Sequence, residues 1–241
     1  MPNDVRAIAH LYPTSRFMHI EVHHPHRWDV TPKEAVAIQR TLADQVREEP
    51  LAEPPQTIAG IDVSIRGDLA QAAIVVLTFP GLEVLDRAIH RAEVPFPYIS
   101  GLLSFREVPV ILPALEKLTV RPDVLMTDSQ GRAHPRRMGL ACHLGVLLDW
   151  PTVGVAKTRL TGHFSELGEE KGSRADLMHK DECIGVVLRT RMNIKPVYVS
   201  VGHRVTLEEA VDLTLACAPR YKIPEPTRQA HHLSREKGPI A

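Results

Sequence analysis

Three acidic residues, Asp62, Glu107 and Asp128, stand at or near the ends of apolar segments in this chain of 241 residues. Asp128 opens a turn-like run, residues 128–139, that also holds His134 and several arginines. Hard divalent cations prefer carboxylate oxygens, and such ions assist the hydrolysis of phosphodiesters. Carboxylates that converge beside a turn rich in His and Arg therefore predict a metal-dependent nuclease.

The elements around Asp62 are predicted to form an antiparallel meander. Residues 58–65, 70–79 and 82–92 are rich in apolar and β-branched side chains, and short Gly-containing turns separate them. Runs of this kind, joined by such turns, are typical of strands linked as hairpins. Asp62 would then lie within the first strand of a sheet.

A parallel unit is predicted to follow. Residues 124–127 and 152–156 resemble buried strands, with an apolar helix at residues 138–148 between them, and strand, helix and strand in succession favour a parallel crossover. The whole is an α/β pattern, a ribonuclease H-like mixed sheet with an antiparallel meander followed by parallel strands and flanked by helices. We also expect helices from Thr31 to residue 48 and at residues 206–217, each capped by its first threonine, and a last helix from residue 225. Pro109 and Pro113 predict a kinked or interrupted helix at residues 104–118, and residues 181–201 resemble a hairpin.

None of the acids is decisive alone. In an alternating strand, Asp62 shares its face with Gly60 and Ser64, and that face could simply meet solvent. Glu107 follows Ser104 by three residues, which is also the spacing of a capping box. Asp128 ends a wholly apolar strand, where open α/β sheets place their ligands. Their joint placement at one edge of the predicted sheet favours the metal site.

Basic residues near these acids could contact phosphate. His134 and His203 lie in loop-like segments and could bind metal or position a water as neutral imidazoles. Lys157 follows a short strand and could neutralise a developing charge. The best phosphate-facing surface in the sequence lies within residues 131–159 and comprises Arg132, Arg136, Arg137, Lys157 and Arg159.

The composition sets wider limits. Lys plus Arg and Asp plus Glu number 29 each, so any surface for a polyanion must be local. The three cysteines show no paired spacing, and we expect small buried residues in a reducing compartment. No apolar run reaches the roughly 18 residues of a membrane span. We expect a soluble, cytoplasmic monomer with no membrane partner, in which residues 27–241 form a single catalytic domain and residues 1–26 a flexible extension.

The chain resembles the endonuclease V family, which cuts nucleic acid near deaminated purines, from about residue 26 to residue 235. Several ordered stretches carry the resemblance. They are Ala-Gly-Ile-Asp-Val at 59–63, Pro-Tyr-Ile-Ser-Gly-Leu-Leu-Ser-Phe-Arg-Glu at 97–107, residues 128–139, Val-Gly-Val-Ala-Lys-Thr-Arg-Leu at 153–160, Gly-His-Arg-Val-Thr-Leu-Glu-Glu at 202–209 and Pro-Glu-Pro-Thr-Arg at 224–228.

The resemblance implies a DNA repair endonuclease that hydrolyses the second phosphodiester 3′ to deoxyinosine and leaves 3′-hydroxyl and 5′-phosphate ends. The cofactor would be Mg²⁺, with Mn²⁺ as a substitute. The implied metal ligands are Asp62, Glu107, Asp128 and His203, assisted in catalysis by Lys157 and His134. The implied substrate-binding residues are Pro97, Tyr98, Ile99 and Ser100, which form a wedge beside the lesion, and Gly101, Leu103 and Gly139, which form a pocket for the displaced base.

Two residues depart from the pattern of the family, and two other functions remain open. Ser100 replaces a proline common in the wedge of the family, which should make the loop less rigid, and Ser129 replaces a common glycine. The chain could instead act on another substrate, either inosine in RNA or an RNA–DNA hybrid. It could also be a non-catalytic ribonuclease H-like module that binds nucleic acid, although such a module usually loses an acid.

Overall fold

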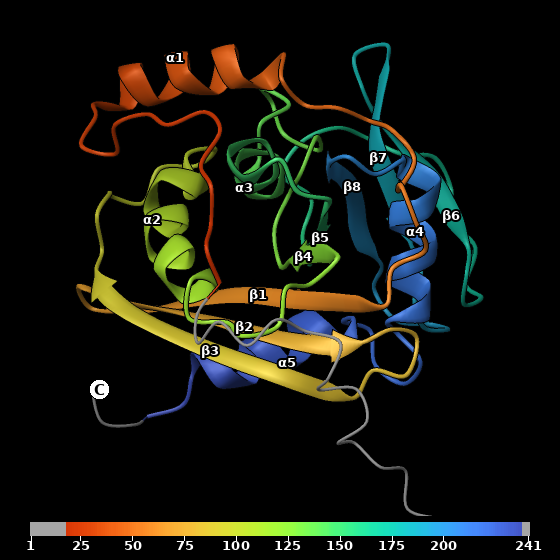
Figure 1. Cartoon of the computed structure of the whole chain (residues 1–241). Coiled ribbons are helices and arrows are strands. Elements are labelled where there is room, and N and C mark those ends of the chain that lie inside the picture. The colour runs from red at the N-terminus through yellow and green to blue at the C-terminus, as the bar shows by residue number, and fades with distance from the viewer. Residues whose placement is uncertain (1–17, 238–241) are drawn as a thin grey trace, which may run out of the picture.

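The computed structural model describes residues 18–237, in which one mixed sheet of eight strands has helices on both faces (Figure 1). The strand order is β3-β2-β1-β4-β5-β8-β7-β6. The strands are β1 (Thr57–Arg66), β2 (Leu69–Thr78), β3 (Val84–Glu93), β4 (Val124–Thr127), β5 (Thr152–Ala156), β6 (Arg174–His179), β7 (Glu182–Leu188) and β8 (Val197–His203). The helices are α1 (Pro32–Ala43), α2 (Leu103–Leu115), α3 (Leu140–Leu148), α4 (Leu207–Ala216) and α5 (Glu225–Ser234).

The predicted mixed sheet is confirmed. Strands β1, β2 and β3 pair antiparallel in sequence order, and β4 pairs parallel with both β1 and β5. The predicted hairpin of β7 and β8 is also present, whereas β6, which pairs with β7, was not predicted. Its sequence, Arg-Ala-Asp-Leu-Met-His, mixes charged and apolar residues and holds no β-branched one.

Alternation along the strands divides the core between the two faces of the sheet. On β2, Val75 and Leu77 join a cluster with residues of α4 and α5, whereas Ile74 and Val76 join one with residues of α2 and α3. Strand β2 is therefore almost wholly buried, as expected of a strand covered by helices on both sides. This double burial fixes the register of the sheet, because a shift by one residue would exchange its faces.

Two of the predicted helix caps are present. Thr31 Oγ1 accepts a hydrogen bond from Glu34 N at 3.3 Å, and the Glu34 carboxylate accepts one from Thr31 N at 2.7 Å. Thr206 and Glu209 form the same capping box at α4. Each pair satisfies backbone donors that the first turn of a helix leaves open.

The capping box predicted for Ser104 and Glu107 is wrong. Helix α2 begins at Leu103, and no side chain caps its first turn. The Ser104 hydroxyl lies 2.8 Å from His143 Nδ1 on α3, because packing of the two helices offers it a partner at a distance. Glu107 thus has no capping role. Pro109 and Pro113 both lie inside α2, which continues through them as one helix, so the interruption that these prolines predict is absent.

Residues 18–26 contact the helical layer. Met18 N donates to Leu118 O at 2.9 Å, and His23 N donates to Leu147 O at 2.8 Å. His26 Nε2 lies 2.7 Å from His143 Nε2, and burial lowers the pKa of His143 to about 3. These contacts hold residues 18–26 of the predicted flexible extension against the rest of the protein. Residues 1–17 lie outside the described residues.

Two expectations from composition can be compared with the structure. Within residues 18–237, no helix is both long and apolar enough to cross a membrane. Cys142 and Cys217 are buried thiols, as predicted, and burial raises the pKa of each to about 12. Cys183, the second residue of β7, is exposed, which corrects the expectation that all the cysteines are buried.

Helix α5 lies directly against β1 at Gly60. A Cβ at Gly60 would overlap the carbonyl group of Pro226 and the backbone nitrogen of Thr227 at the start of this helix. Farther along, the Ser64 hydroxyl donates to the carbonyl oxygen of Ser234. The face of β1 that holds Gly60, Asp62 and Ser64 therefore meets α5 rather than solvent.

We expect Gly60→Ala to destabilise the protein by ~1–3 kcal/mol, because the added methyl group overpacks this contact. The free energy of unfolding in urea measures the loss. Gly81→Ala is the matched control, since its Cβ would meet only the Thr78 side chain, at 3.0 Å from Oγ1. Equal effects of the two substitutions would contradict the close packing of α5 on β1.

Candidate active site

The three predicted acids converge. In the parallel pair of β1 and β4, Ile61 lies opposite Thr127, and Asp128 N donates to Ile61 O at 3.3 Å. Asp62 and Asp128 are the next residues of these two strands, so the register places them side by side. Glu107 on α2 lines the same cavity, whose volume is ≈ 120 Å³. The predicted meeting of strand, helix and strand is thus present, and we name this space the acid cavity.

Charge repulsion is concentrated in the acid cavity. Burial, together with the negative charges of Asp62 and Asp128, raises the pKa of Glu107 to about 8. Burial also raises the pKa of Asp128, although its ion pair with Lys157 opposes this shift. Like charges in a poorly solvated site favour protonation unless a cation compensates them. A bound cation would therefore allow all three carboxylates to ionise.

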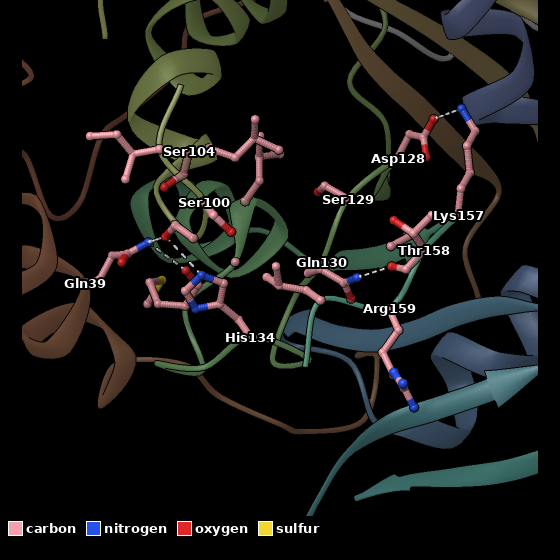
Figure 2. A pocket seen from close by; sticks show the side chains of 18 of the residues that line it. Gln39, Ser100, Ser104, Asp128, Ser129, Gln130, His134, Lys157, Thr158 and Arg159 are labelled. Atoms are coloured by element: carbon pink, nitrogen blue, oxygen red, sulfur yellow. Dashed lines mark hydrogen bonds and ion pairs between the residues drawn. The ribbon is translucent and has the colours of Figure 1, made fainter. Parts of the chain in front are cut away.

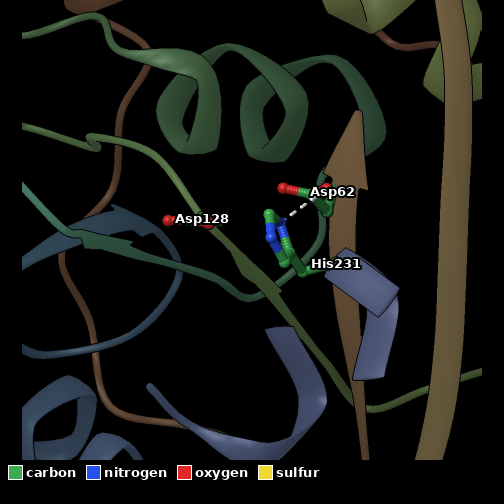
Figure 3. A group of neighbouring side chains, drawn as sticks. All are labelled: Asp62, Asp128 and His231. Carbon is green, nitrogen blue, oxygen red and sulfur yellow. Dashed lines mark ion pairs between the residues drawn. The ribbon is translucent and has the colours of Figure 1, made fainter. Parts of the chain in front are cut away.

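His231, on α5, joins two of these acids (Figure 3). Ligand atoms of Asp62, Asp128 and His231 all lie within 4.8 Å of one another. His231 Nδ1 is 3.3 Å from Asp62 Oδ2, yet this buried nitrogen has no hydrogen-bond partner among the described residues. An imidazole nitrogen left open beside carboxylate oxygens fits a divalent cation, and carboxylate-rich sets suit Mg²⁺ or Mn²⁺.

The structure does not bring His203 to the acid cavity, which corrects the ligand set implied by the resemblance. His203 Nε2 lies 3.1 Å from Asp149 Oδ1, and its Nδ1 accepts from Arg47 N at 3.2 Å. This histidine joins the end of β8 to the segment after α3. His231 supplies the imidazole instead. Its signal in the sequence is weak and consists of the adjacent pair His231-His232 late in the last helix.

Lys157 lies where the sequence predicts, directly after β5. Its ammonium group makes an ion pair with Asp128 Oδ2 and is half-buried (Figure 2). Strands β4 and β5 are parallel neighbours, so their carboxyl ends bring these two residues to one edge of the sheet. Lys157 can neutralise Asp128 or a phosphate group beside it.

A second cavity, of ≈ 380 Å³, adjoins the acid cavity (Figure 2). We call it the base cavity. It shares Asp128, Ser129 and Leu140 with the acid cavity. Of the predicted substrate-binding residues, its lining contains Tyr98, Ile99, Ser100, Gly101, Leu103 and Gly139 but not Pro97, which is exposed. The structure thus brings most of this set together.

Gly101 fixes the loop that carries Tyr98. Its φ of +79° favours glycine, and its carbonyl oxygen accepts from Gln39 Nε2 at 3.0 Å and Arg136 Nη2 at 2.7 Å, with His134 Nε2 also at 3.0 Å. Gly139 also lines the cavity, and a Cβ there would overlap the Gln130 carbonyl group. The two glycines therefore allow the segments that form the cavity to pack closely against one another.

His134 is part of this scaffold. Its Nδ1 accepts from Arg136 N at 3.2 Å, while Nε2 contacts Gly101 O. Burial lowers the pKa of His134 to about 4, so the ring is neutral near pH 7. A neutral imidazole with one donor and one acceptor satisfies both contacts. His134 therefore holds the cavity wall, and the structure does not place it in the group that could hold a metal.

The predicted phosphate-facing surface is largely wrong. Arg132 and Arg137 both pair with Glu182, at 2.6 Å and 2.8 Å. Arg136 is bound to Gln39 and Gly101. The sequence could not reveal these partners, because Glu182 arrives from a distant hairpin. Of that set, only Lys157 and Arg159 line the base cavity.

Comparisons with known proteins agree with this geometry. A family model described as Endonuclease V matches residues 40–232. The endonuclease V of Nostoc punctiforme is 48% identical over 215 residues, which cover 88% of this chain and 97% of the relative. The structure of endonuclease V from Streptomyces avermitilis is 44% identical, with a TM-score of 0.83 over 89% of this chain and 96% of that one. The matched residues include every acid of the cavity.

A nucleic-acid complex is among the similar structures. It is endonuclease V of Ciona intestinalis bound to a 24mer DNA containing an inosine followed by a ribo-adenosine. That protein is 29% identical to this chain, with a TM-score of 0.74 over 84% of this chain and 95% of its own.

The two histidine assignments can be separated by Mn²⁺ titration calorimetry. We expect His231→Ala to weaken Mn²⁺ binding by about tenfold or more, because an open ligand nitrogen is lost. His203→Ala should keep the Mn²⁺ affinity but lower the melting temperature, because it removes the contacts with Asp149 and Arg47. A loss of affinity in the His203 variant alone would restore the ligand set taken from the resemblance.

Proposed function

The chain belongs to the endonuclease V family, and we propose that it cleaves DNA at the second phosphodiester 3′ to deoxyinosine. The observation that carries the proposal is the base cavity beside the acid cavity, with Asp128 in the wall of both. A flipped base and a neighbouring phosphodiester could therefore be held at the same time. Residues 27–241 would act as one catalytic domain, since residues from 39 to 231 contribute to the cavities.

We infer that Asp62, Glu107, Asp128 and His231 hold Mg²⁺, with Mn²⁺ as a substitute. The raised pKa of Glu107 and the open nitrogen of His231 support this fit. Divalent ions bound there would stabilise negative charge on the attacking and leaving oxygens of the phosphodiester. Lys157 would release Asp128 to the metal and place its own positive charge beside the phosphate. Cleavage would leave 3′-hydroxyl and 5′-phosphate ends.

The wedge of residues 97–100 suits entry into the stack beside the lesion. Tyr98 is 73% exposed, and the Arg106 guanidinium lies 5.9 Å from the centre of its ring. Ile99 is half-buried and packs against a cluster of aromatic and aliphatic residues, so the loop behind the tyrosine is anchored. An exposed aromatic tip on an anchored loop can fill the gap that a flipped base leaves.

An RNA substrate is the second candidate. The Ciona intestinalis complex contains a ribo-adenosine after its inosine, so that protein accommodates a ribose there. Specific contacts with the 2′-hydroxyl decide such a preference. The non-catalytic alternative is not favoured, because the acids and Lys157 converge at one site.

The test uses end-labelled DNA and RNA strands, each with one inosine or none, in Mg²⁺ or in chelator. We expect nicking that requires both metal and inosine, one nucleotide beyond the lesion, with the faster strand naming the substrate. Asp128→Asn should reduce the rate by on the order of a thousandfold while inosine binding is retained. Equal cutting of undamaged strands, or cutting in chelator, would contradict the proposal.

Tyr98→Ala tests the wedge. We expect inosine-containing DNA to bind about tenfold or more weakly, because one stacking contact is lost, whereas binding to undamaged DNA changes little. Fluorescence anisotropy measures both affinities. Tyr221→Ala is the control, since Tyr221 is also exposed and lies near an arginine, Arg228, but does not line the base cavity. Equal losses on both DNAs would remove Tyr98 from lesion recognition.

A further inference from the structure

A third hollow adjoins the acids at Asp62, whereas the base cavity meets them at Asp128. Its volume is ≈ 360 Å³, and its lining includes Asp62, Ser64, Arg66, Lys157, His231 and Arg235. It shares Asp62 and Val63 with the acid cavity, and Lys157 with the base cavity. We name it the downstream groove. The acid cavity therefore adjoins two hollows, one suited to a base and one lined mainly by polar and charged side chains.

The downstream groove is rich in positive charge. Arg66 ends β1, Arg235 follows α5, and both side chains are exposed, while Lys157 lies nearer the acids. Asp62 is the groove's acidic residue, and it already contacts the Ser234 hydroxyl at 2.6 Å. Arginine guanidinium groups bind phosphate oxygens through paired hydrogen bonds. The charge of this groove thus suits a phosphate rather than a base.

The positions of its arginines are fixed by the fold. Arg66 Nη2 donates to the backbone oxygen of Arg235 at 2.6 Å, and this contact joins the end of β1 to the end of α5. The same helix presents His231 to the acids (Figure 3). The downstream groove and the proposed metal site therefore share one structural element, so a strand bound in the groove would be held in register with the acids.

A nucleic-acid strand passes through these spaces in one direction. If the base cavity holds the inosine and the acids hold the scissile phosphate on its 3′ side, the following nucleotide needs a path that leads away from the acids. The downstream groove, which meets the acids at Asp62, supplies such a path and is lined by arginines. We propose that the downstream groove binds the phosphate next 3′ to the cut, with Arg66 and Arg235 as its ligands. This inference rests on the proposed function, and it adds a strand-positioning site that reads no base.

The experiment varies the length of DNA 3′ to the cut. Substrates carry one inosine and a constant 5′ flank, and end either at the first nucleotide past the cut or several nucleotides farther on. In the wild type we expect kcat/KM to rise with the longer 3′ flank. In the Arg66→Gln/Arg235→Gln double variant this rise should disappear, mainly through a KM increased by roughly tenfold for the longer substrate, because two phosphate contacts are lost.

Salt dependence supplies a second readout. The slope of log Kd against log salt for the longer substrate should decrease by about one for each arginine removed. Arg66→Lys/Arg235→Lys should recover part of the flank dependence, since the charge is retained. Arg174→Gln is the matched control, because Arg174 lies on β6 at the other edge of the sheet, where it pairs with Glu208. That variant should keep the flank dependence of the wild type.

Three outcomes would overturn the inference. They are a full flank effect in the double glutamine variant, a loss that follows the 5′ flank instead, and a fall in kcat at every length together with weaker Mn²⁺ binding. The last would mean that Arg66 serves only to seat α5. Failure of the proposed function is distinguishable, because the wild type would then leave inosine-containing strands of every length uncut.

Discussion

The structure depends on holding three carboxylates of like charge in one small, poorly solvated cavity. Burial and this repulsion together raise the pKa of Glu107 to about 8. Three elements that could move apart carry these groups, so the helices must be fixed to the sheet by contacts elsewhere. Two such contacts are the Gly60 packing under α5 and the bond from Ser104 on α2 to His143 on α3. Each holds a helix that presents a site residue.

The sheet and the loops have different tasks. Strands β1 and β4 set the relative position of Asp62 and Asp128 by parallel pairing, and the buried strand β2 makes that register costly to shift. The base cavity is built mainly from loops and helix starts, with Gly101 as its most heavily bonded point. The two aspartates are therefore placed by the sheet, whereas the lining of the base cavity lies mainly on segments that can vary without loss of the sheet.

Much of the fold follows from local sequence, and the failures at the candidate site are non-local. Alternating apolar residues and Gly-containing turns predict the meander, and Thr-x-x-Glu predicts two caps correctly, because each signal is contained within a few residues. Ser104 has the spacing of a cap, but packing offers its hydroxyl a histidine on another helix. Arg132 and Arg137 resemble a phosphate surface until Glu182 is placed beside them. Pairings of this kind depend on the topology of the fold, which cannot be inferred from the spacing of residues within one segment.

The histidines show the same limit. His134, His143 and His203 are all buried, and both ring nitrogens of each already contact the protein. Such a ring must give up a hydrogen bond before it can bind a metal, whereas His231 keeps Nδ1 open beside Asp62. Residue type and loop position suggest His134 and His203 alike, and the family resemblance selects His203. A histidine is ready to bind a metal when one of its ring nitrogens has no hydrogen-bond partner. In His231, the packing of α5 on β1 leaves Nδ1 in that state beside Asp62.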